Sequence, residues 1–198
     1  MVTRTGPLTK NADTVALGLF QIRVGSSSDN IANIGVQLNS TNSIGALAST
    51  KFMGNKEYWE LFSGFPQLKD KTLTIKEEAA VECEFKELQP FNLYLALGKD
   101  PVTDSQSETI SGEIPLGDVT APAYVRMEAV YTYPDATSTC SIIFPRAQVT
   151  SAVEMDFQET DNVNVPITFT ANRADSGISG GNAVWDSKPY GHILFASS

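Results

Sequence analysis

Paired carboxylates are the residues of this sequence whose types and spacing could do chemistry. Glu82 and Glu84 stand two positions apart in a run of alternating apolar and polar residues, and so do Glu154 and Asp156. In an extended strand, each pair projects from one face, and two such carboxylates could serve glycoside hydrolysis. Sugar sites also use aromatic platforms, however, and Trp59 is one of only two tryptophans. The pattern therefore favours a solvated or water-lining acidic face over a hydrolase.

The single histidine, His192, limits the other kinds of catalytic site. A Ser-His-Asp or Cys-His arrangement would have to be built around this residue near the chain end, where a structural role is expected. One histidine and two well-separated cysteines do not supply a usual zinc ligand set. We therefore predict no catalytic, cofactor-binding or metal-binding residue, and we do not expect an enzyme.

The Gly-rich segment GISGGN, residues 177–182, superficially resembles a phosphate-binding loop. It lacks a following Lys-Ser/Thr pair and the full dinucleotide spacing. Its glycines are therefore expected to serve backbone geometry.

Length and charge restrict the class of protein further. The 198 residues suffice for one domain with a substantial core. A net charge of −9 opposes an external nucleic-acid-binding surface, which needs clustered Lys and Arg. We read no signal peptide and no membrane span. Cys83 and Cys140 are in phase with apolar neighbours, as buried hydrophobes are, although a disulfide between them stays open.

The clearest secondary-structure signal is the stretch TLTIKEEAAVECEFKEL, residues 72–88, where apolar residues alternate with charged ones. It predicts a long strand, or a hairpin that pivots near Glu77 and Glu78, with one face in water. The following segment, residues 90–98, predicts a short helix that ends at Gly98.

Strand-like runs fill most of the remaining chain. The first is expected over residues 14–24, and NIGVQL at 33–38 is a short second run. Five more runs follow the helix, and turn signals separate most of them. They cover residues 108–116, 123–133, 138–149, 151–159 and 163–171. Short strands with one helix predict a mainly β fold, as a β-sandwich or barrel-like domain with one short flanking helix.

Residues 39–71 are expected to form a long inter-strand loop, polar at first and then rich in aromatic residues. Long connections of this kind tend to be functional or ordered by a partner. The spacing of Tyr58, Trp59 and Phe62 suits one turn of helix. The aromatic side chains could fold back as a satellite core or dock on a neighbouring subunit, and both interpretations stay open.

The order of these features resembles the major tail tube protein family of long-tailed bacteriophages, over about residues 14–175. The resemblance depends on the acidic strand followed by NLYLALG, and on the later strand VPITFTA. It implies a β-sandwich that closes into hexameric rings, which stack into a hollow tube through which DNA passes. The implied division is an N-terminal arm (1–13), a tail tube domain (14–175) and a C-terminal segment (176–198).

The resemblance also assigns roles to residues. The lumen of such tubes is usually acidic, which keeps DNA from binding to the wall. The implied lumen-lining residues are Glu78, Glu82, Glu84, Glu154 and Asp156. Because the family's long loop reaches an adjacent ring, Trp59, Phe62 and Phe65 are the implied inter-subunit contacts.

The implied partners are the chain itself, DNA in transit, and tail proteins such as the tape measure, sheath or terminator, and baseplate. No membrane partner is implied, and the protein would be part of the virion tail, assembled in the host cytoplasm. The alternative function is a monomeric β-sandwich binding module, for example for carbohydrate, with a ligand held by the aromatic loop.

Overall fold

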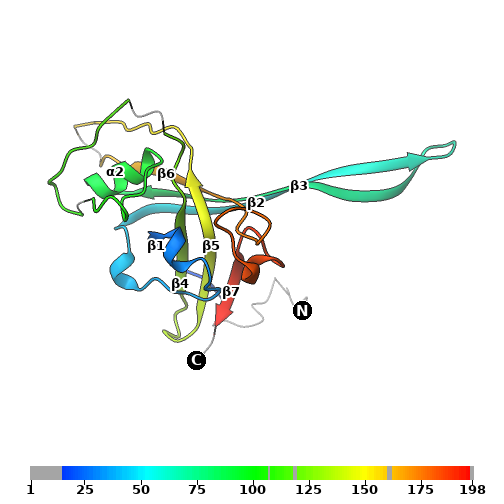
Figure 1. The fold of residues 1–198 in the computed structure, drawn as a ribbon, viewed down its shortest axis with the longest axis horizontal. Helices are drawn as coiled ribbons and strands as arrows, with labels where there is room; N and C mark the ends of the chain where they lie inside the picture. Colours follow the sequence, from blue (N-terminus) through cyan, green and yellow to red (C-terminus); the bar gives the residue numbers. More distant parts are fainter. Residues whose placement is uncertain (1–14, 107, 118–119, 160–161, 197–198) are drawn as a thin grey trace, which may run out of the picture.

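The structure, a computed structural model, describes residues 15–106, 108–117, 120–159 and 162–196, and its strands form one antiparallel sheet (Figure 1). The sheet has the order β1-β4-β5-β6-β3-β2, and β7 pairs with β5. The strands are β1 (Gln21–Ser26), β2 (Leu47–Ser63), β3 (Leu68–Phe85), β4 (Val125–Thr132), β5 (Thr139–Val149), β6 (Val165–Ala171) and β7 (His192–Ala196). The helices are α1 (Ser27–Asn30) and α2 (Pro90–Ala96), with 3-10 turns η2 (Ser40–Asn42) and η3 (Ala183–Trp185). The predicted mainly β class is confirmed, and the expected N-terminal arm lies outside the described residues.

Strand β5 changes partners along its length, which lets the sheet curl around one core. Residues 139–143 pair with β7, whereas residues 147–149 pair with β6. In Figure 1, β4 and β5 consequently run steeply across the direction of β2 and β3. The core takes side chains from both halves of the sheet and from α2, including Val24, Phe85, Leu95, Met127 and Phe169. β6 is buried on alternate residues, whereas β4 and β5 at the centre of the sheet are buried over most of their length.

Helix α2 lies where the sequence predicts it. Pro90 occupies the first turn, and Phe91 and Leu95 are buried against the sheet. Gly98 follows the helix with φ +79°, a left-handed conformation that favours glycine. A Cβ atom at Gly98 would also lie 2.9 Å from the carbonyl oxygen of Val149. The Gly98 stop signal is therefore confirmed.

The prediction of a long loop over residues 39–71 is wrong, because most of this segment is β structure. After η2, the chain enters β2, and β2 forms a long antiparallel hairpin with β3. Trp59 pairs with Leu73, and Tyr58 pairs with Thr74, so these aromatic residues lie on a strand and not on a helical turn. The β2 arm of this hairpin was not predicted, because most of its side chains are exposed on both faces, whereas the β3 arm includes most of the strand predicted over residues 72–88. Residues 54–63 of β2 have no buried face, and they lack the period-2 pattern that indicated the strand at residues 72–88.

Three other expected strands are also absent from the described residues, and the first strand starts at Gln21. Residues 33–38 contain no strand, and neither do the described parts of 108–116 and 151–159. In the last of these, Val153 and Met155 pack against the core while Glu154 and Asp156 are exposed. The alternation there reflects burial without strand pairing.

The C-terminal segment covers the outer side of the sheet. Trp185 is fully buried with Ile143 and Ala174, and its indole Nε1 donates to the carbonyl of Ile31 at 2.5 Å. A Cβ atom at Gly181 would lie 1.8 Å from the carbonyl oxygen of Asp175. At Gly181, the prediction that the GISGGN glycines serve backbone geometry is therefore confirmed.

The two cysteines, Cys83 and Cys140, are both free, so the disulfide that the sequence left open does not form. Cys83 is buried in the core, as its apolar phase predicts, whereas Cys140 is only partly buried. Burial raises the pKa of the Cys83 thiol to about 12. In the described part of the chain, no helix has the length and apolar character needed to cross a membrane.

Candidate functional site

The hairpin formed by β2 and β3 projects away from the rest of the sheet (Figure 1). Strand β3 pairs with β6 only over residues 80–85, and beyond this point it pairs only with β2. The burial of β3 changes at the same place, from exposed residues up to Glu78 to the buried Val81, Cys83 and Phe85. Ten residues at about 3.3 Å each carry the β2 side of the ribbon about 30 Å outward. Residues 54–79 are called the ribbon below.

Large apolar side chains are exposed along the ribbon. Phe65 at its turn is fully exposed, and about half of the surface of Trp59 and of Phe62 is exposed. The other exposed apolar residues of the ribbon are Tyr58, Leu61, Leu68, Leu73 and Ile75. Large apolar side chains exposed in such number on one element indicate an interaction site. The structure thus places all three predicted contact residues on one projecting element.

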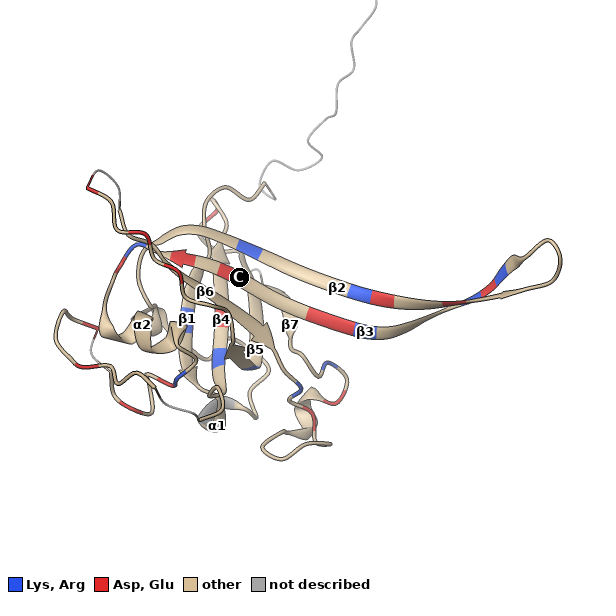
Figure 2. Cartoon of the chain, turned by 90° about the horizontal axis from the view of Figure 1, so that it is seen from above, with Lys and Arg blue, Asp and Glu red and all other residues tan. Residues whose placement is uncertain are grey.

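The ribbon is also close to electrically neutral. It carries four lysines and five carboxylates, a net charge of −1, which leaves −8 on the rest of the chain. Figure 2 shows positions of both signs on its two strands. Lys56 pairs with Glu77 at 3.2 Å, and Lys69 pairs with Glu60 across the strands. Lys76 pairs with Glu78 at 2.6 Å, and the hydrogen bond to this carboxylate raises the pKa of Lys76.

The acidic face lies at the base of the hairpin, where β3 joins the sheet. Glu82 and Glu84 are exposed to different degrees on the side of β3 opposite the core. They stand beside Thr168 and Pro166 of β6, as the predicted alternation requires. The Glu82 carboxylate pairs with Lys51 of β2 at 3.2 Å. One lysine therefore offsets part of the negative charge of this face.

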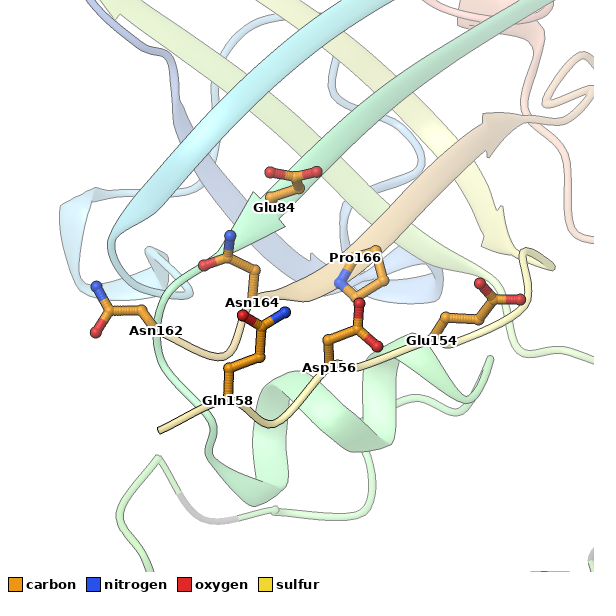
Figure 3. Close-up of a pocket in the computed structure, with 7 residues that line it drawn as sticks. All are labelled: Glu84, Glu154, Asp156, Gln158, Asn162, Asn164 and Pro166. Carbon is orange, nitrogen blue, oxygen red and sulfur yellow. The ribbon is translucent and has the colours of Figure 1, made fainter. Parts of the chain in front are cut away.

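Glu84, Glu154 and Asp156 line one open hollow of about 250 Å³. Figure 3 shows Glu154 and Asp156 on the segment that runs beside β6, with Glu84 on the neighbouring strand. Gln158, Asn162, Asn164 and Pro166 complete the lining, which contains no Lys or Arg. The structure thus joins the two acidic pairs that the sequence offered separately. Glu82 does not line this hollow, and Glu78 lines a different cleft with Lys76.

These carboxylates are not arranged as a metal-ligand set. Among the described residues, no group of three or more His, Cys, Asp or Glu side chains is arranged to hold a metal ion. His192 begins β7 and packs edge-on against Trp185, with ring centroids 5.6 Å apart. Burial lowers the pKa of His192. The described contacts of His192 are thus those of a packed side chain.

One polar arrangement was missed by the sequence reading. Arg126 and Glu128 of β4 are fully buried, and the Arg126 Nε donates to Glu128 at 2.7 Å. Glu128 also accepts from the backbone N–H of Leu38 at 3.0 Å, and Arg126 donates to the carbonyl of Gly35 at 2.7 Å. The pair therefore fastens residues 33–38 to the sheet in place of strand pairing. Two charges inside an otherwise apolar run were the available signal.

No protein-family model matches this chain, and no curated protein matches it. Three similar solved structures are a tail of an empty gene transfer agent particle with C6 symmetry, a virion of a native gene transfer agent particle, and the tube-terminating cap of the anti-feeding prophage. The identities are 10%, 11% and 8%, and the TM-scores are 0.42, 0.41 and 0.43. The matches cover 90%, 90% and 96% of this chain, and 96%, 95% and 100% of the other chains. Because these TM-scores lie below 0.5, the function of this chain has to be inferred from its own residues.

Proposed function

We propose that this protein is a structural subunit that assembles with copies of itself into hexameric rings, and that these rings stack to form a hollow virion tail tube. The observation that carries the proposal is the ribbon, a projecting two-stranded element with exposed aromatic side chains and almost no net charge. An isolated two-stranded hairpin is marginally stable in water. A partner surface that covers Trp59, Phe62 and Phe65 would stabilise the ribbon, and the ribbon would then serve as an inter-subunit contact.

Charge supports a second copy of the chain as that partner. The part of the chain outside the ribbon carries a net charge of −8, so two such bodies repel each other. The ribbon, with its lysines paired to carboxylates, can approach an acidic body at much lower electrostatic cost. The outer edge of β2 is also unpaired among the described strands, and a long free edge is a template for pairing with another chain.

The acidic face supports a DNA conduit in place of a DNA-binding surface. Glu84, Glu154 and Asp156 line a hollow without a lysine or arginine, so phosphate groups find no cation there. We propose that this face lines the lumen and that DNA passes it without specific binding during ejection into the host. Other tail proteins would contact the ends or the outside of the tube, and the chain would do no catalysis.

The alternative of a carbohydrate-binding module requires aromatic residues gathered around a cavity. Trp59, Phe62 and Phe65 instead lie along the ribbon, and they do not line the clefts at Glu84 or at Arg146. We therefore do not adopt this alternative.

Electron microscopy of the purified protein at high concentration tests the proposal. The wild-type chain should form rings or hollow tubes. A variant in which an Asn-Gly turn replaces residues 55–78 should remain a folded monomer, because those residues pair only with one another. Rings of unchanged size and abundance in this variant would contradict the proposed role of the ribbon.

A further inference from the structure

Arg146 is a buried cation without a carboxylate partner. Only 9% of its surface is exposed, and none of the ion pairs among the described residues includes it. Its Nη1 donates to the carbonyls of Arg173 and Ser179 at 3.3 and 3.2 Å, and its guanidinium lies 3.9 Å from the ring centroid of Tyr124. Neutral carbonyls and a ring offset only part of the cost of burying a full charge. The fully buried Arg126, by contrast, forms an ion pair with Glu128.

A β-bulge sets the direction of the Arg146 side chain. Met127 pairs with Phe144 and Val125 pairs with Ala147, so Pro145 and Arg146 both stand opposite the single residue Arg126. Phe144 and Ala147 both enter the core. The extra residue lets the chain turn Arg146 out of the core without interrupting it. Bulges re-aim side chains in this way beside functional sites.

Arg146 lines an open cleft of about 590 Å³ at the base of the ribbon. The cleft is walled by Tyr124, Ile178 and Tyr190, and by residues 76–78 of β3. Its other charged side chains already have partners within the chain. Lys76 pairs with Glu78, Glu77 pairs with Lys56, and Arg173 pairs with Asp175. Arg146 is therefore the charge in this cleft that is left for an incoming group.

We propose that the cleft binds a carboxylate, and that the carboxylate is an acidic side chain of a second copy of this chain. A guanidinium has five donors in a planar fork, which suits a carboxylate, and both hydrogen bonds of Arg146 to the described residues use Nη1. The aromatic and aliphatic walls suit the stem of a protein side chain better than a small ion. A second copy is the occupant because each chain has 23 acidic residues and because the cleft is continuous with the ribbon. The choice of partner rests on the proposed function, whereas the carboxylate site itself does not.

The variant Arg146→Met tests the inference, because methionine keeps a similar stem and removes the charge. Self-association, measured by sedimentation velocity, should weaken about thirtyfold or more, as expected when one partner of a hydrogen-bonded charge pair is lost. The melting temperature of the monomer should be unchanged or higher, because no buried cation remains to be desolvated. Arg23→Met is the matched control, since that arginine lies outside the cleft and is hydrogen-bonded to Gln21 and to the carbonyl of Leu38, and it should change association less than threefold.

Glutarate provides a second measurement that does not require a folded variant. On the wild-type monomer, it should shift the NMR signal of the Arg146 Nε–H, and chloride at equal ionic strength should not. It should also inhibit self-association of the wild-type chain.

The outcomes separate this inference from the proposed function. Wild-type rings together with unchanged association of Arg146→Met would overturn the inference and leave the proposed function standing. A lower melting temperature of Arg146→Met, together with no glutarate-induced shift of the Arg146 Nε–H signal in the wild-type chain, would also overturn the inference. Arg146 would then stabilise the fold by its hydrogen bonds to backbone carbonyls. A wild-type chain that stays monomeric would overturn the second copy as occupant together with the proposed function. A glutarate shift would support the carboxylate site in either case.

Discussion

Truncation of Phe65 to alanine should weaken self-association without destabilising the monomer. Phe65 lies at the turn of the ribbon and is fully exposed in the single chain, so the folded monomer loses no buried contact when the phenyl group is removed. If the phenyl group of Phe65 becomes fully buried in an assembly, its removal lowers the association free energy by about 1.5–3 kcal/mol at each interface. This free energy corresponds to an association about 10- to 150-fold weaker per contact.

Sedimentation velocity over a concentration series would measure the association, and thermal unfolding would measure the monomer. Ile110→Ala is a suitable control, because Ile110 is almost as exposed but lies in a loop outside the ribbon. The control should match the wild-type chain in both measurements.

Association of Phe65→Ala within twofold of the wild-type value would refute the reasoning, since it would mean that the ring stays in water in the assembly. A large fall in monomer stability would refute it differently, by showing that Phe65 packs against its own chain.

Three further perturbations test other parts of the molecule. The double substitution Glu82→Lys and Glu84→Lys, which raises the net charge from −9 to −5, should leave ring formation intact and slow DNA passage; unchanged infectivity would place this face outside the lumen. Glu128→Gln should lower the free energy of unfolding in urea by about 3–5 kcal/mol, because Arg126 stays buried without its counter-charge; a loss below about 1 kcal/mol would contradict this. Burial lowers the pKa of His192 from its ordinary value of 6.5, so the unfolded chain binds more protons, and stability should fall as the pH drops below about 6.5. In His192→Asn this part of the pH dependence should be weaker, and equal slopes in urea titrations would count against the assignment.

The parts of the fold that were predicted correctly are those whose apolar side chains enter the core. Residues 79–85 alternate because Val81, Cys83 and Phe85 face inward, and β6 alternates for the same reason. β4 and β5 fall within predicted apolar runs because they are buried over most of their length. Helix α2 was found from its apolar spacing and its glycine stop. Such patterns are local, so they survive in the sequence.

The β2 arm of the ribbon was missed because it pairs only with β3 and has no buried face, whereas the β3 arm from residue 72 onward lay within a predicted strand. Tyr58, Trp59 and Phe62 look equally suited to a helical turn when only their spacing is read. The prediction of a strand over residues 151–159 was wrong for the opposite reason. Val153 and Met155 alternate with acidic residues and pack against the core, but this segment pairs with no strand. An alternating pattern indicates that every second side chain is buried, but it does not indicate that the segment is hydrogen-bonded to a neighbouring strand.

The sequence by itself determined the net charge, the mainly β class, the absence of a usual zinc ligand set, and the acidic and aromatic residue types available for an assembly. Only the tertiary structure decided that Glu84 meets Glu154 and Asp156, that the aromatic residues project on a ribbon, and that Arg146 is buried without a carboxylate. The physical reason is distance along the chain. Composition and alternation depend on neighbouring residues, whereas a hollow, a projecting edge or an uncompensated charge depends on which distant segments the core brings together.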